Sequence, residues 1–335
     1  MKTLKVFESF AGYGSQSLAL RYAGIPFKSV GFSEIDDKAI KAYNVLHGDV
    51  KNYGDITKIE AEKLPNFDLF TYSFPCQALS SLGKQGGMRE NSGTTSSLIW
   101  ETKKIIEAKK PKYLLMENVP GLLNKKNRIE FDKWLKYLEG LGYINKYAVL
   151  DASDFYVPQH RERVIMVSTL LKKDRLFEIP LYYNKKKKKP VLMDILDDVV
   201  DKKYDLKPTY KSTYKLNMRE RKSGRVLNRL GFISPTYGRG NAGAIYDATG
   251  LSPTIIAGCG MGGNNVPHIY LGKKNRKDNI RRLTPIECLR LQGVRNSDIN
   301  KLIESGLFSD TDLYKLAGNS IAVPVHFKVF KELFK

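Results

Sequence analysis

Short apolar runs alternate with amphipathic stretches over the first half of the chain, between Lys5 and Thr169. The apolar runs have the length of buried strands, and the amphipathic stretches repeat with the period of helices. This alternation is typical of an open parallel sheet with helices on both faces. We therefore predict an α/β fold for this half, followed by a smaller domain, because 335 residues exceed one small module.

The individual elements follow from the same alternation. The predicted strands are 4–10, 29–33, 68–73, 112–116, 147–150 and 163–168. The predicted helices are 18–23, 38–46, 98–108 and 129–138. Gly24, Gly48 and Gly140 are predicted to end helices, since glycine readily takes the left-handed conformation that closes a helix C-terminus.

The character of the sequence changes after Thr169. Lysine runs such as 185–189, prolines and a glycine-rich tract at 238–263 replace the regular alternation. Glycines at this density fit loops whose backbone lies close to a ligand, although surface turns would look the same. We predict a smaller, irregular second domain here, with a helical pattern that returns at 284–292.

The net charge narrows the class of partner. The chain carries 56 Lys and Arg against 35 Asp and Glu, a net charge of +21, which favours a polyanionic partner through counterion release. A lysine-rich proteome would give the same excess, so charge alone does not separate the two. The chain has no secretory segment at its start and no apolar stretch of the roughly 20 residues that a membrane helix needs. We expect a cytoplasmic protein without a membrane partner.

Residues that follow strands are the first site candidates, since ligands bind at the carboxyl ends of parallel strands. The first strand ends in Phe-Ala-Gly-Tyr-Gly-Ser, where Gly12 and Gly14 allow a tight turn beside a cofactor. A dinucleotide fingerprint would want a third glycine where Ser17 stands. Glu34, about 20 residues further on, has the spacing of a carboxylate that binds ribose hydroxyls. These residues predict a nucleoside cofactor without separating NAD from S-adenosylmethionine, and an ordinary strand-to-helix turn is the alternative.

The three cysteines, Cys76, Cys259 and Cys288, lie too far apart for a disulfide framework or a zinc cluster. Cys76 follows the third strand in Ser-Phe-Pro-Cys-Gln, at the mouth of the predicted crevice. A thiol there is a candidate nucleophile if positive charge or a helix dipole lies near it, and a small buried hydrophobe is the alternative. Glu117 follows the next strand, and a carboxyl group opposite a thiol suits general acid work on a heteroaromatic ring.

Two arginines stand at the start of the sixth predicted strand, in Gln159-His160-Arg161-Glu162-Arg163. Arg161 and Arg163 are two positions apart, so in an extended chain both side chains project to one face. There they could serve an anion or a carbonyl oxygen. Taken alone, the motif is better explained by a salt-bridged edge strand.

Taken in chain order, these residues resemble the motif series of the C5-cytosine DNA methyltransferases. The resemblance covers nearly the whole chain and rests on nine segments in the family's order. These segments are FAGYGS, GFSEID, YGDIT, SFPCQALSSLGKQGG, SSLIWE, MENVPGLL, ASDFYVPQHRERV, RRLTPIECLRLQG and LAGNSIAVPV. The Pro75-Cys76-Gln77 and 159–163 segments are highly specific in combination.

The resemblance implies a Rossmann-like S-adenosylmethionine-dependent domain at 1–172 and a smaller target-recognition domain with a hinge at 173–305. A C-terminal segment at 306–335 would return to the catalytic domain. Residues at the matching motif positions would line the S-adenosylmethionine pocket: Phe10, Ala11, Gly12, Gly14, Glu34, Ile35, Asp55, Ile56, Pro75, Leu98, Asn319 and Ser320. In the family's pattern Glu34 takes the ribose and Asp55 the adenine amino group, and S-adenosylhomocysteine is the product. The implied catalytic residues, which would surround a flipped-out cytosine, are Cys76, Glu117, Arg161 and Arg163.

The implied reaction accounts for these residue types. The Cys76 thiolate adds to C6 of cytosine and makes C5 nucleophilic, while Glu117 binds the N3 edge and Arg163 holds O2, where negative charge develops. C5 then takes the methyl group, and loss of the C5 proton with elimination of Cys76 restores the ring. A cytosine in a duplex must first be flipped out, at a cost of a few kcal/mol. The glycine-containing loop after Cys76 would close over the DNA.

DNA contacts are expected from the loop after Cys76 and from glycine-rich loops of the second domain. The candidates are Gln77, Ser80, Leu82, Lys84, Arg239, Asn241, Thr254 and Asn264. Ser15 departs from the glycine that many family members carry, and Leu82 need not fill the vacated base position. We expect double-stranded DNA as the partner, a monomeric enzyme, no metal, and a restriction endonuclease only as a genetic partner.

Other functions stay open at this point. A tRNA cytosine methyltransferase would share the chemistry, although the long second domain favours DNA. A nucleic-acid-binding protein with an inactive core would explain the net charge of +21, but the catalytic positions hold competent residues. An NAD-dependent oxidoreductase would explain Gly12, Gly14 and Glu34, yet it would leave Cys76 and Glu117 without a role.

Overall fold

The computed structural model describes residues 2–79, 86–170, 177–182, 188–211, 213–218, 225–236, 242–261, 265–272 and 280–335. The chain divides into two compact units. The first comprises Met1–Leu150, Glu162–Tyr183 and Val325–Lys335, and the second comprises Asp151–Arg161 and Asn184–Pro324. Residues 306–324 therefore group with the second unit, whereas the resemblance assigned the whole of 306–335 to the catalytic domain. The domain boundaries at 172 and 305 stay predictions.

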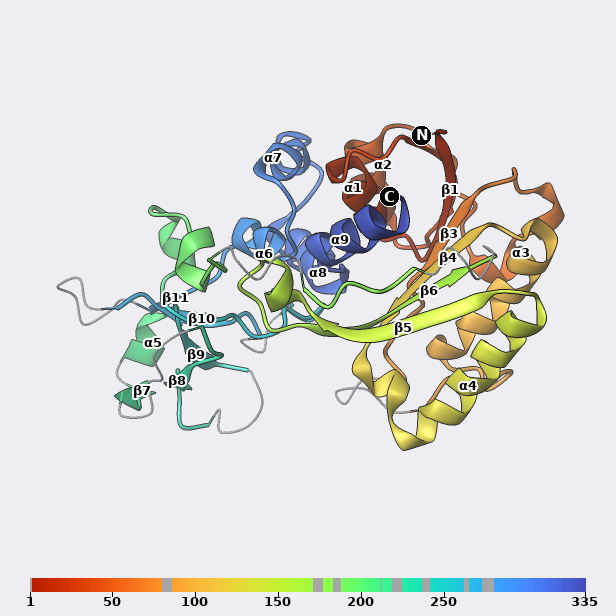
Figure 1. Cartoon of the computed structure of the whole chain (residues 1–335). Coiled ribbons are helices and arrows are strands. Elements are labelled where there is room, and N and C mark those ends of the chain that lie inside the picture. The colour runs from red at the N-terminus through yellow and green to blue at the C-terminus, as the bar shows by residue number, and fades with distance from the viewer. Residues whose placement is uncertain are drawn as a thin grey trace. The chain divides into compact units, whose positions relative to one another are not determined.

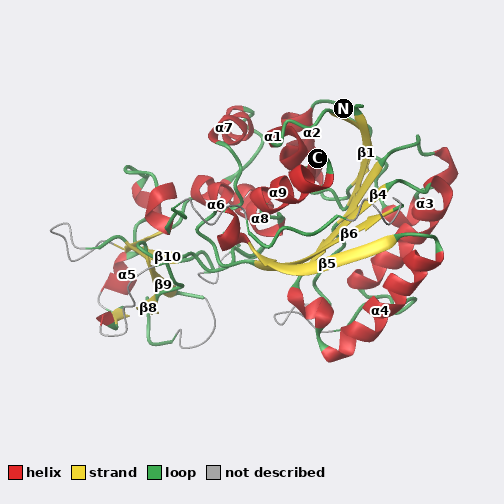
Figure 2. Ribbon diagram, in the orientation of Figure 1, coloured by secondary structure: helices red, strands yellow, loops and turns green. Residues whose placement is uncertain are grey.

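A six-stranded sheet forms the first unit (Figures 1 and 2). Its strands are β1 (Leu4–Ser9), β2 (Phe27–Ser33), β3 (Leu69–Tyr72), β4 (Tyr113–Asn118), β5 (Ile144–Asp151) and β6 (Glu162–Thr169), in the spatial order β2-β1-β3-β4-β6-β5. All six predicted strands and the α/β class are confirmed. The sheet is mixed, however, because β6 runs antiparallel to β4 while β2, β1, β3 and β4 are parallel.

The reversed strand brings a new segment to the edge of the sheet where ligands bind. The connection at 152–161, between β5 and β6, holds no α-helix, and parallel neighbours need such a crossover. In the antiparallel register, Asn118 at the end of β4 lies opposite Val164 at the start of β6. Arg163, directly before Val164, therefore lies at the carboxyl ends of the parallel strands.

Helices cover both faces of this sheet (Figure 1). They are α1 (Ser15–Tyr22), α2 (Asp37–His47), α3 (Thr102–Lys109), α4 (Lys125–Gly140) and α9 (Val323–Leu333), with 3-10 helices at Thr95–Glu101 and Pro120–Leu123. Successive residues of β1 point to opposite faces. Phe7 belongs to the core cluster that includes α3 and α4, whereas Glu8 accepts hydrogen bonds from residues of α1 and α2.

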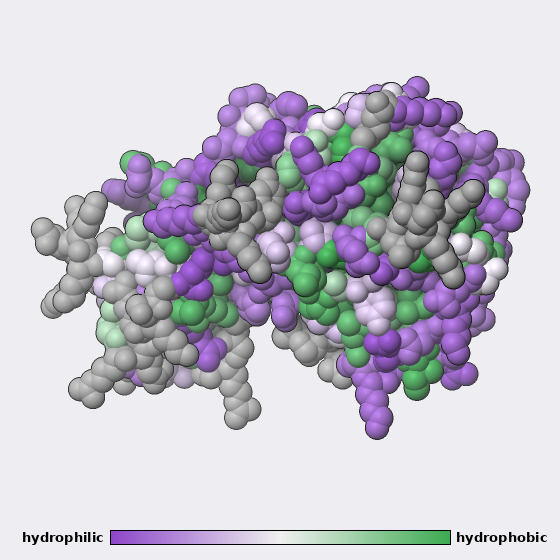
Figure 3. All heavy atoms as spheres, in the orientation of Figure 1, coloured by the Kyte–Doolittle hydropathy of each residue, from purple (hydrophilic) through white to green (hydrophobic). Residues whose placement is uncertain are grey.

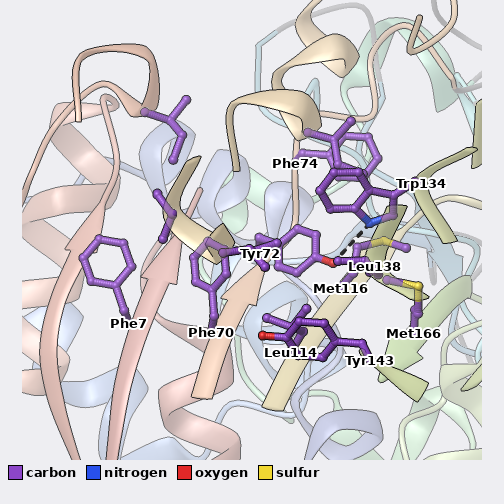
Figure 4. Packing of buried hydrophobic residues seen from close by; sticks show 14 of the residues in the cluster. Phe7, Phe70, Tyr72, Phe74, Leu114, Met116, Trp134, Leu138, Tyr143 and Met166 are labelled. Atoms are coloured by element: carbon purple, nitrogen blue, oxygen red, sulfur yellow. Dashed lines mark hydrogen bonds between the residues drawn. The ribbon is translucent and has the colours of Figure 1, made fainter. Parts of the chain in front are cut away.

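The main hydrophobic core lies between the sheet and the pair α3 and α4 (Figure 4). Helix α4 buries Asn127, Phe131, Trp134 and Leu138, at intervals of three or four residues, so one face meets the sheet. The indole Nε1 of Trp134 donates to the Tyr72 hydroxyl at 3.3 Å. Figure 3 shows hydrophilic side chains along the outer side of these two helices, as the amphipathic pattern requires.

The four helices predicted in the first half are confirmed, with shifted ends. Gly48 ends α2 at φ +83° and Gly24 follows α1 at φ +68°, both in the left-handed region. The stop predicted at Gly140 is confirmed as the last residue of α4, although the left-handed residue is Gly142, at φ +93°. Helix α4 begins four residues before the predicted start at 129 and ends two residues after the predicted end at 138.

The second unit contains its own five-stranded sheet, which the sequence analysis did not predict. Its strands are β7 (Lys215–Leu216), β8 (Arg229–Phe232), β9 (Ala244–Asp247), β10 (His268–Tyr270) and β11 (Ile280–Arg282), in the order β11-β10-β9-β8-β7. Strands of two to four residues are too short to show a period. Its α-helices are α5 (Pro208–Lys211), α6 (Pro285–Leu291), α7 (Asn296–Glu304) and α8 (Asp310–Asn319), and α6 confirms the pattern at 284–292.

Across the part of the chain that the structure describes, none of the helices combines the length and the apolar character needed to cross a membrane.

Candidate active site

The turn after β1 is shaped by left-handed residues. Phe10, Gly12 and Gly14 have φ of +55°, +56° and +77°. A Cβ on Gly14 would lie 2.4 Å from Nε2 of His47 and 2.8 Å from the ring of Tyr43, so this position admits glycine alone. A Cβ on Gly12 would meet no atom within 4 Å, which leaves open space beside the turn. The backbone of this turn can therefore be approached closely.

Glu34 is fixed by backbone donors at the end of β2. Its Oε2 accepts from the Gly12 N–H at 2.8 Å, and its Oε1 accepts from the N–H groups of Ile35 and Asp36 at 2.8 and 2.9 Å. The carboxylate thus joins the turn after β1 to the turn after β2. The neighbouring Ile35 side chain is 73% exposed, an apolar group presented beside this carboxylate.

Asn52 connects the segment 54–56 to Glu34, and its role was missed from the sequence. Its Oδ1 accepts from the N–H groups of Glu34 and Gly54 at 3.2 and 3.0 Å, and its Nδ2 donates to the Glu34 carbonyl at 3.0 Å. Asp55 follows directly. The N–H and hydroxyl of Thr57 donate to its carboxylate, which lowers the pKa of Asp55 and keeps it charged.

Glu8, a buried carboxyl group of β1, was also missed from the sequence. Glu8 accepts hydrogen bonds from the Ser17 hydroxyl at 2.5 Å and the Tyr43 hydroxyl at 2.6 Å, and burial raises its pKa. Ser17 stands where a dinucleotide fingerprint would carry its third glycine. Its hydroxyl has a structural use here, so the departure from that fingerprint has a physical reason.

The turn that carries Cys76 leaves the sheet between β3 and β4. Cys76 is half-buried, and its carbonyl accepts from the Leu79 N–H at 2.9 Å. Asn118, at the end of β4, donates from Nδ2 to the Phe74 carbonyl at 3.0 Å. The Ser96 hydroxyl donates to the Pro75 carbonyl at 2.7 Å. The turn that carries the thiol is therefore held against Asn118, the last residue of β4, which follows Glu117 in the chain.

Glu117 and Arg163 form an ion pair at the same edge. Nε of Arg163 lies 3.0 Å from Oε1 of Glu117, and the two side chains are 17% and 9% exposed. Nη1 of Arg163 also donates to the Glu162 carbonyl at 2.7 Å. The edge thus presents a half-buried thiol together with a paired carboxylate and guanidinium.

Arg161 and Arg163 have different partners, and the place of Arg161 among the catalytic residues stays a prediction. Its side chain is 3% exposed and belongs to the second unit. Its guanidinium donates to the main-chain carbonyls of Ile255, Gly318 and Ser320. Arg161 directly precedes β6, which begins at Glu162.

The other cofactor candidates divide between the two units. Phe10, Ala11, Ile56, Pro75 and Leu98 belong to the first unit, whereas Asn319 and Ser320 belong to the second. Ile56 and Ala11 are buried, Pro75 and Leu98 are half-buried, and Asn319 is exposed at the end of α8.

The DNA-contact candidates are only partly within the described residues. Gln77 is exposed in the Cys76 turn, and the Thr254 hydroxyl donates to the His160 carbonyl at 2.7 Å, a structural use. Ser80, Leu82, Lys84, Arg239, Asn241 and Asn264 lie outside the described residues. In the described ranges, no group of three or more His, Cys, Asp or Glu side chains could hold a metal ion.

Comparison with known proteins places the chain in one family. A family model described as C-5 cytosine-specific DNA methylase matches residues 4–335. Type II methyltransferase M2.ScrFI of Lactococcus lactis subsp. cremoris is 36% identical over 99% of both chains. Orphan methyltransferase M.SssI of Spiroplasma monobiae is 36% identical over 87% of this chain and 72% of its own. The crystal structure of S. pombe Dnmt2 methyltransferase shares the fold, with a TM-score of 0.74, 20% identity and coverage of 99% and 98%. The chain belongs to the C-5 cytosine-specific DNA methylase family.

Proposed function

We propose that this family member transfers a methyl group from S-adenosylmethionine to C5 of a cytosine flipped out of double-stranded DNA, through a covalent bond between Cys76 and C6. The observation that carries the proposal is the Glu117–Arg163 pair, 3.0 Å apart, at the sheet edge that also holds the Cys76 turn. A thiol, a carboxylate and a guanidinium at one edge supply the nucleophile and the two hydrogen-bonding groups that a cytosine ring needs.

The residues after β1, β2 and Asn52 fit the adenosine part of S-adenosylmethionine. Glu34 offers a carboxylate for the ribose hydroxyls, and the exposed Ile35 side chain offers an apolar surface for the adenine ring. Asp55 stays charged and can accept a hydrogen bond from the adenine amino group. The open space at Gly12 admits a ligand against the backbone. S-adenosylmethionine supplies the electrophilic methyl group when it is bound.

The chain's own residues act on the cytosine ring. The Cys76 thiolate forms a bond to C6, and the electron pair of the C5–C6 double bond moves to C5, which becomes the nucleophile. Glu117 hydrogen-bonds the N3 edge, and Arg163 donates to O2, where negative charge develops during addition. After C5 is methylated, the C5 proton leaves and the sulfur–C6 bond breaks. This elimination returns the thiolate and restores the aromatic ring.

Duplex DNA is the proposed substrate in preference to tRNA. The support is the separate second unit, Asn184–Pro324 with Asp151–Arg161, whereas the net charge of +21 fits either polyanion. Binding of a polyanion through many cationic contacts weakens steeply as the salt concentration rises. The relatives include type II and orphan methyltransferases, so the enzyme acts either as the companion of a restriction endonuclease or alone.

The direct test is transfer of isotopically labelled methyl groups from S-adenosylmethionine to duplex DNA and to tRNA in parallel. We expect label in DNA, and bisulfite sequencing of the product should then give the recognition sequence. Label in tRNA alone would move the proposal to the alternative substrate. No label in either nucleic acid would leave a binding protein with an inactive core.

The cofactor part has its own test in the absence of DNA. Glu34→Gln should weaken S-adenosylmethionine binding in titration calorimetry by about tenfold or more, since a charged hydrogen bond contributes roughly 1.5–3 kcal/mol. Asp37→Asn, an exposed carboxylate three residues further on, is the matched control and should bind like the wild type. Equal loss in both variants would contradict the role of Glu34.

A further inference from the structure

We propose that Arg161 is a positioning residue that caps the C-terminal end of α8 and thereby fixes the turn Gly318-Asn319-Ser320, whose last two residues the family resemblance assigns to S-adenosylmethionine. The cap is made entirely within the second unit. Its consequence for the methyl donor rests on the proposed function, whereas the cap itself rests on contacts alone.

The guanidinium of Arg161 is directed at main-chain carbonyl groups. Nη1 donates to the Ile255 carbonyl at 2.8 Å, and Nη2 donates to the Gly318 carbonyl at 3.2 Å and to the Ser320 carbonyl. The side chain is 3% exposed, so these bonds form away from water. A guanidinium that left them for a cytosine ring would strand buried carbonyls, which is costly.

Two of the three acceptors belong to the end of a helix. Helix α8 ends at Asn319 with Ser320 as its C-cap. The last four carbonyl groups of a helix have no partner within it, and the helix dipole places negative charge there. A buried cation that donates to such carbonyls satisfies both requirements. Arg161 therefore determines where α8 stops and how the following turn leaves it.

A close backbone contact holds the same helix end from the other side. A Cβ on Gly318 would lie 2.2 Å from the carbonyl carbon of Ile256 and 2.4 Å from the N–H nitrogen of Ala257. Gly318 thus packs against the residue that follows Ile255, whose carbonyl the guanidinium already binds. With Gly318 packed inward, Asn319 is exposed and Ser320 is buried.

Arg161 itself is anchored by its backbone. Its N–H donates to Oδ1 of Asp151 at 3.1 Å, and its carbonyl accepts from the Ala152 N–H at 3.0 Å. Gln159 adds a parallel link, because its Oε1 accepts from the Ile255 N–H at 2.9 Å. The guanidinium therefore connects the segment 151–161 to the end of α8 through hydrogen bonds.

The test uses Arg161→Lys in the full-length protein, because lysine keeps the charge but loses the planar fork that reaches three carbonyls. Arg225→Lys is the matched control, since Arg225 also donates to main-chain carbonyls of the second unit, those of Pro190, Ser153 and Val157, none of which belongs to α8. Binding of S-adenosylmethionine is measured by calorimetry without DNA. Backbone hydrogen exchange is measured without S-adenosylmethionine.

Arg161→Lys should speed amide exchange at residues 318–322 and weaken S-adenosylmethionine binding about tenfold or more. Arg225→Lys should change neither quantity. Lost turnover with unchanged exchange and affinity would make Arg161 a catalytic residue and overturn the proposal. Faster exchange with no S-adenosylmethionine binding in the wild type would keep the cap and reject the proposed function.

A second variant covers the case in which Arg161→Lys does not fold. Gly318→Ala pushes the helix end away from Ile256 and should give the same pair of changes at residues 318–322 and in affinity. Wild-type exchange and affinity in this variant would contradict the proposal. If circular dichroism shows both variants unfolded, Arg161 supports the whole second unit rather than one helix end, and the proposal fails.

Discussion

Arg163 and Glu117 meet across two antiparallel strands, with Nε of the arginine 3.0 Å from Oε1 of the glutamate. Glu117 lies opposite Ile165 in the register of β4 and β6, and Arg163 stands two residues before Ile165. Both side chains therefore point to the same face and pair diagonally. The register of the mixed sheet thus assembles the two groups proposed to bind the N3 and O2 atoms of cytosine.

The stability of this pair can be tested with Glu117→Gln, Arg163→Met and the double variant. Each single change leaves one largely buried charge without its partner and should cost of order 2–3 kcal/mol of unfolding free energy, somewhat below the roughly 3–5 kcal/mol seen for fully buried pairs. The double variant should be destabilised by at least about 1 kcal/mol less than the sum. Urea unfolding of the four proteins measures this coupling.

The control for this cycle is Glu178→Gln, which removes the partner of Lys146 in an exposed pair and should cost less than about 1 kcal/mol. Both single variants at the edge should also lose roughly a hundredfold or more in turnover. Additive stabilities and near-normal turnover would show that the pair is an ordinary surface contact.

Gly121 should be needed for catalysis because of where its missing side chain would lie. A Cβ on Gly121 would stand 2.2 Å from the Leu79 carbonyl oxygen, and Leu79 donates its N–H to the Cys76 carbonyl. Gly121→Ala should therefore displace the turn that carries the thiol and lower turnover by about a hundredfold, the scale of a misplacement near 1 Å.

Single-turnover methyl transfer measures this effect, with S-adenosylmethionine affinity as the quantity that stays constant. Gly140→Ala is the matched control, because a Cβ at that helix position meets no atom within 4 Å. This variant should keep full activity. Equal activity of the two alanine variants would show that Leu79 can shift to make room for the new Cβ without displacing Cys76.

His268 should make the second unit sensitive to acid. Burial in β10, with Arg282 opposite in β11, lowers the pKa of His268 from 6.5 to about 4. Between these values the unfolded chain binds a proton that the folded chain does not, so stability falls as the pH drops from about 6.5 toward about 4. The loss amounts to about 3 kcal/mol, at roughly 1.4 kcal/mol per pKa unit.

Denaturant unfolding at pH values from 7.5 to about 4.5 measures this dependence in the wild type and in His268→Gln. The variant cannot take up the proton and should lose less stability over this range. Parallel loss in both proteins would assign the acid sensitivity to other groups.

The structure of the first unit can be predicted from the sequence more completely than that of the second. Strands β1 to β6 and the positions of Glu34, Cys76 and Glu117 follow from local apolar period and from the rule that polar residues after parallel strands form the site. The antiparallel direction of β6 depends on a partner strand far away in sequence, so no local pattern predicts it. The strands of the second sheet are too short for a period to appear.

Residues that hold the site together were harder to predict than those that would touch a ligand. Asn52 and Asn118 act through side-chain hydrogen bonds to backbone groups, among them the Glu34 and Phe74 carbonyls, and these bonds depend on tertiary packing. Arg161 looked equivalent to Arg163 because the two are spaced as on one face of a strand. Arg161 lies just before β6, which begins at Glu162, and its guanidinium donates to main-chain carbonyls at the end of α8.

The proposed mechanism depends on a covalent bond between Cys76 and the cytosine ring. This bond can be tested with a duplex in which 5-fluorocytosine replaces cytosine throughout, so the target sequence need not be known. Fluorine cannot leave C5 as a proton does, so an adduct that has taken the methyl group should persist. Mass spectrometry of the protein after reaction with this duplex and S-adenosylmethionine should show a nucleic-acid adduct on the peptide that contains Cys76, and Cys76→Ser should show none. An adduct on Cys259 or Cys288, or an active enzyme that forms no adduct, would contradict the account.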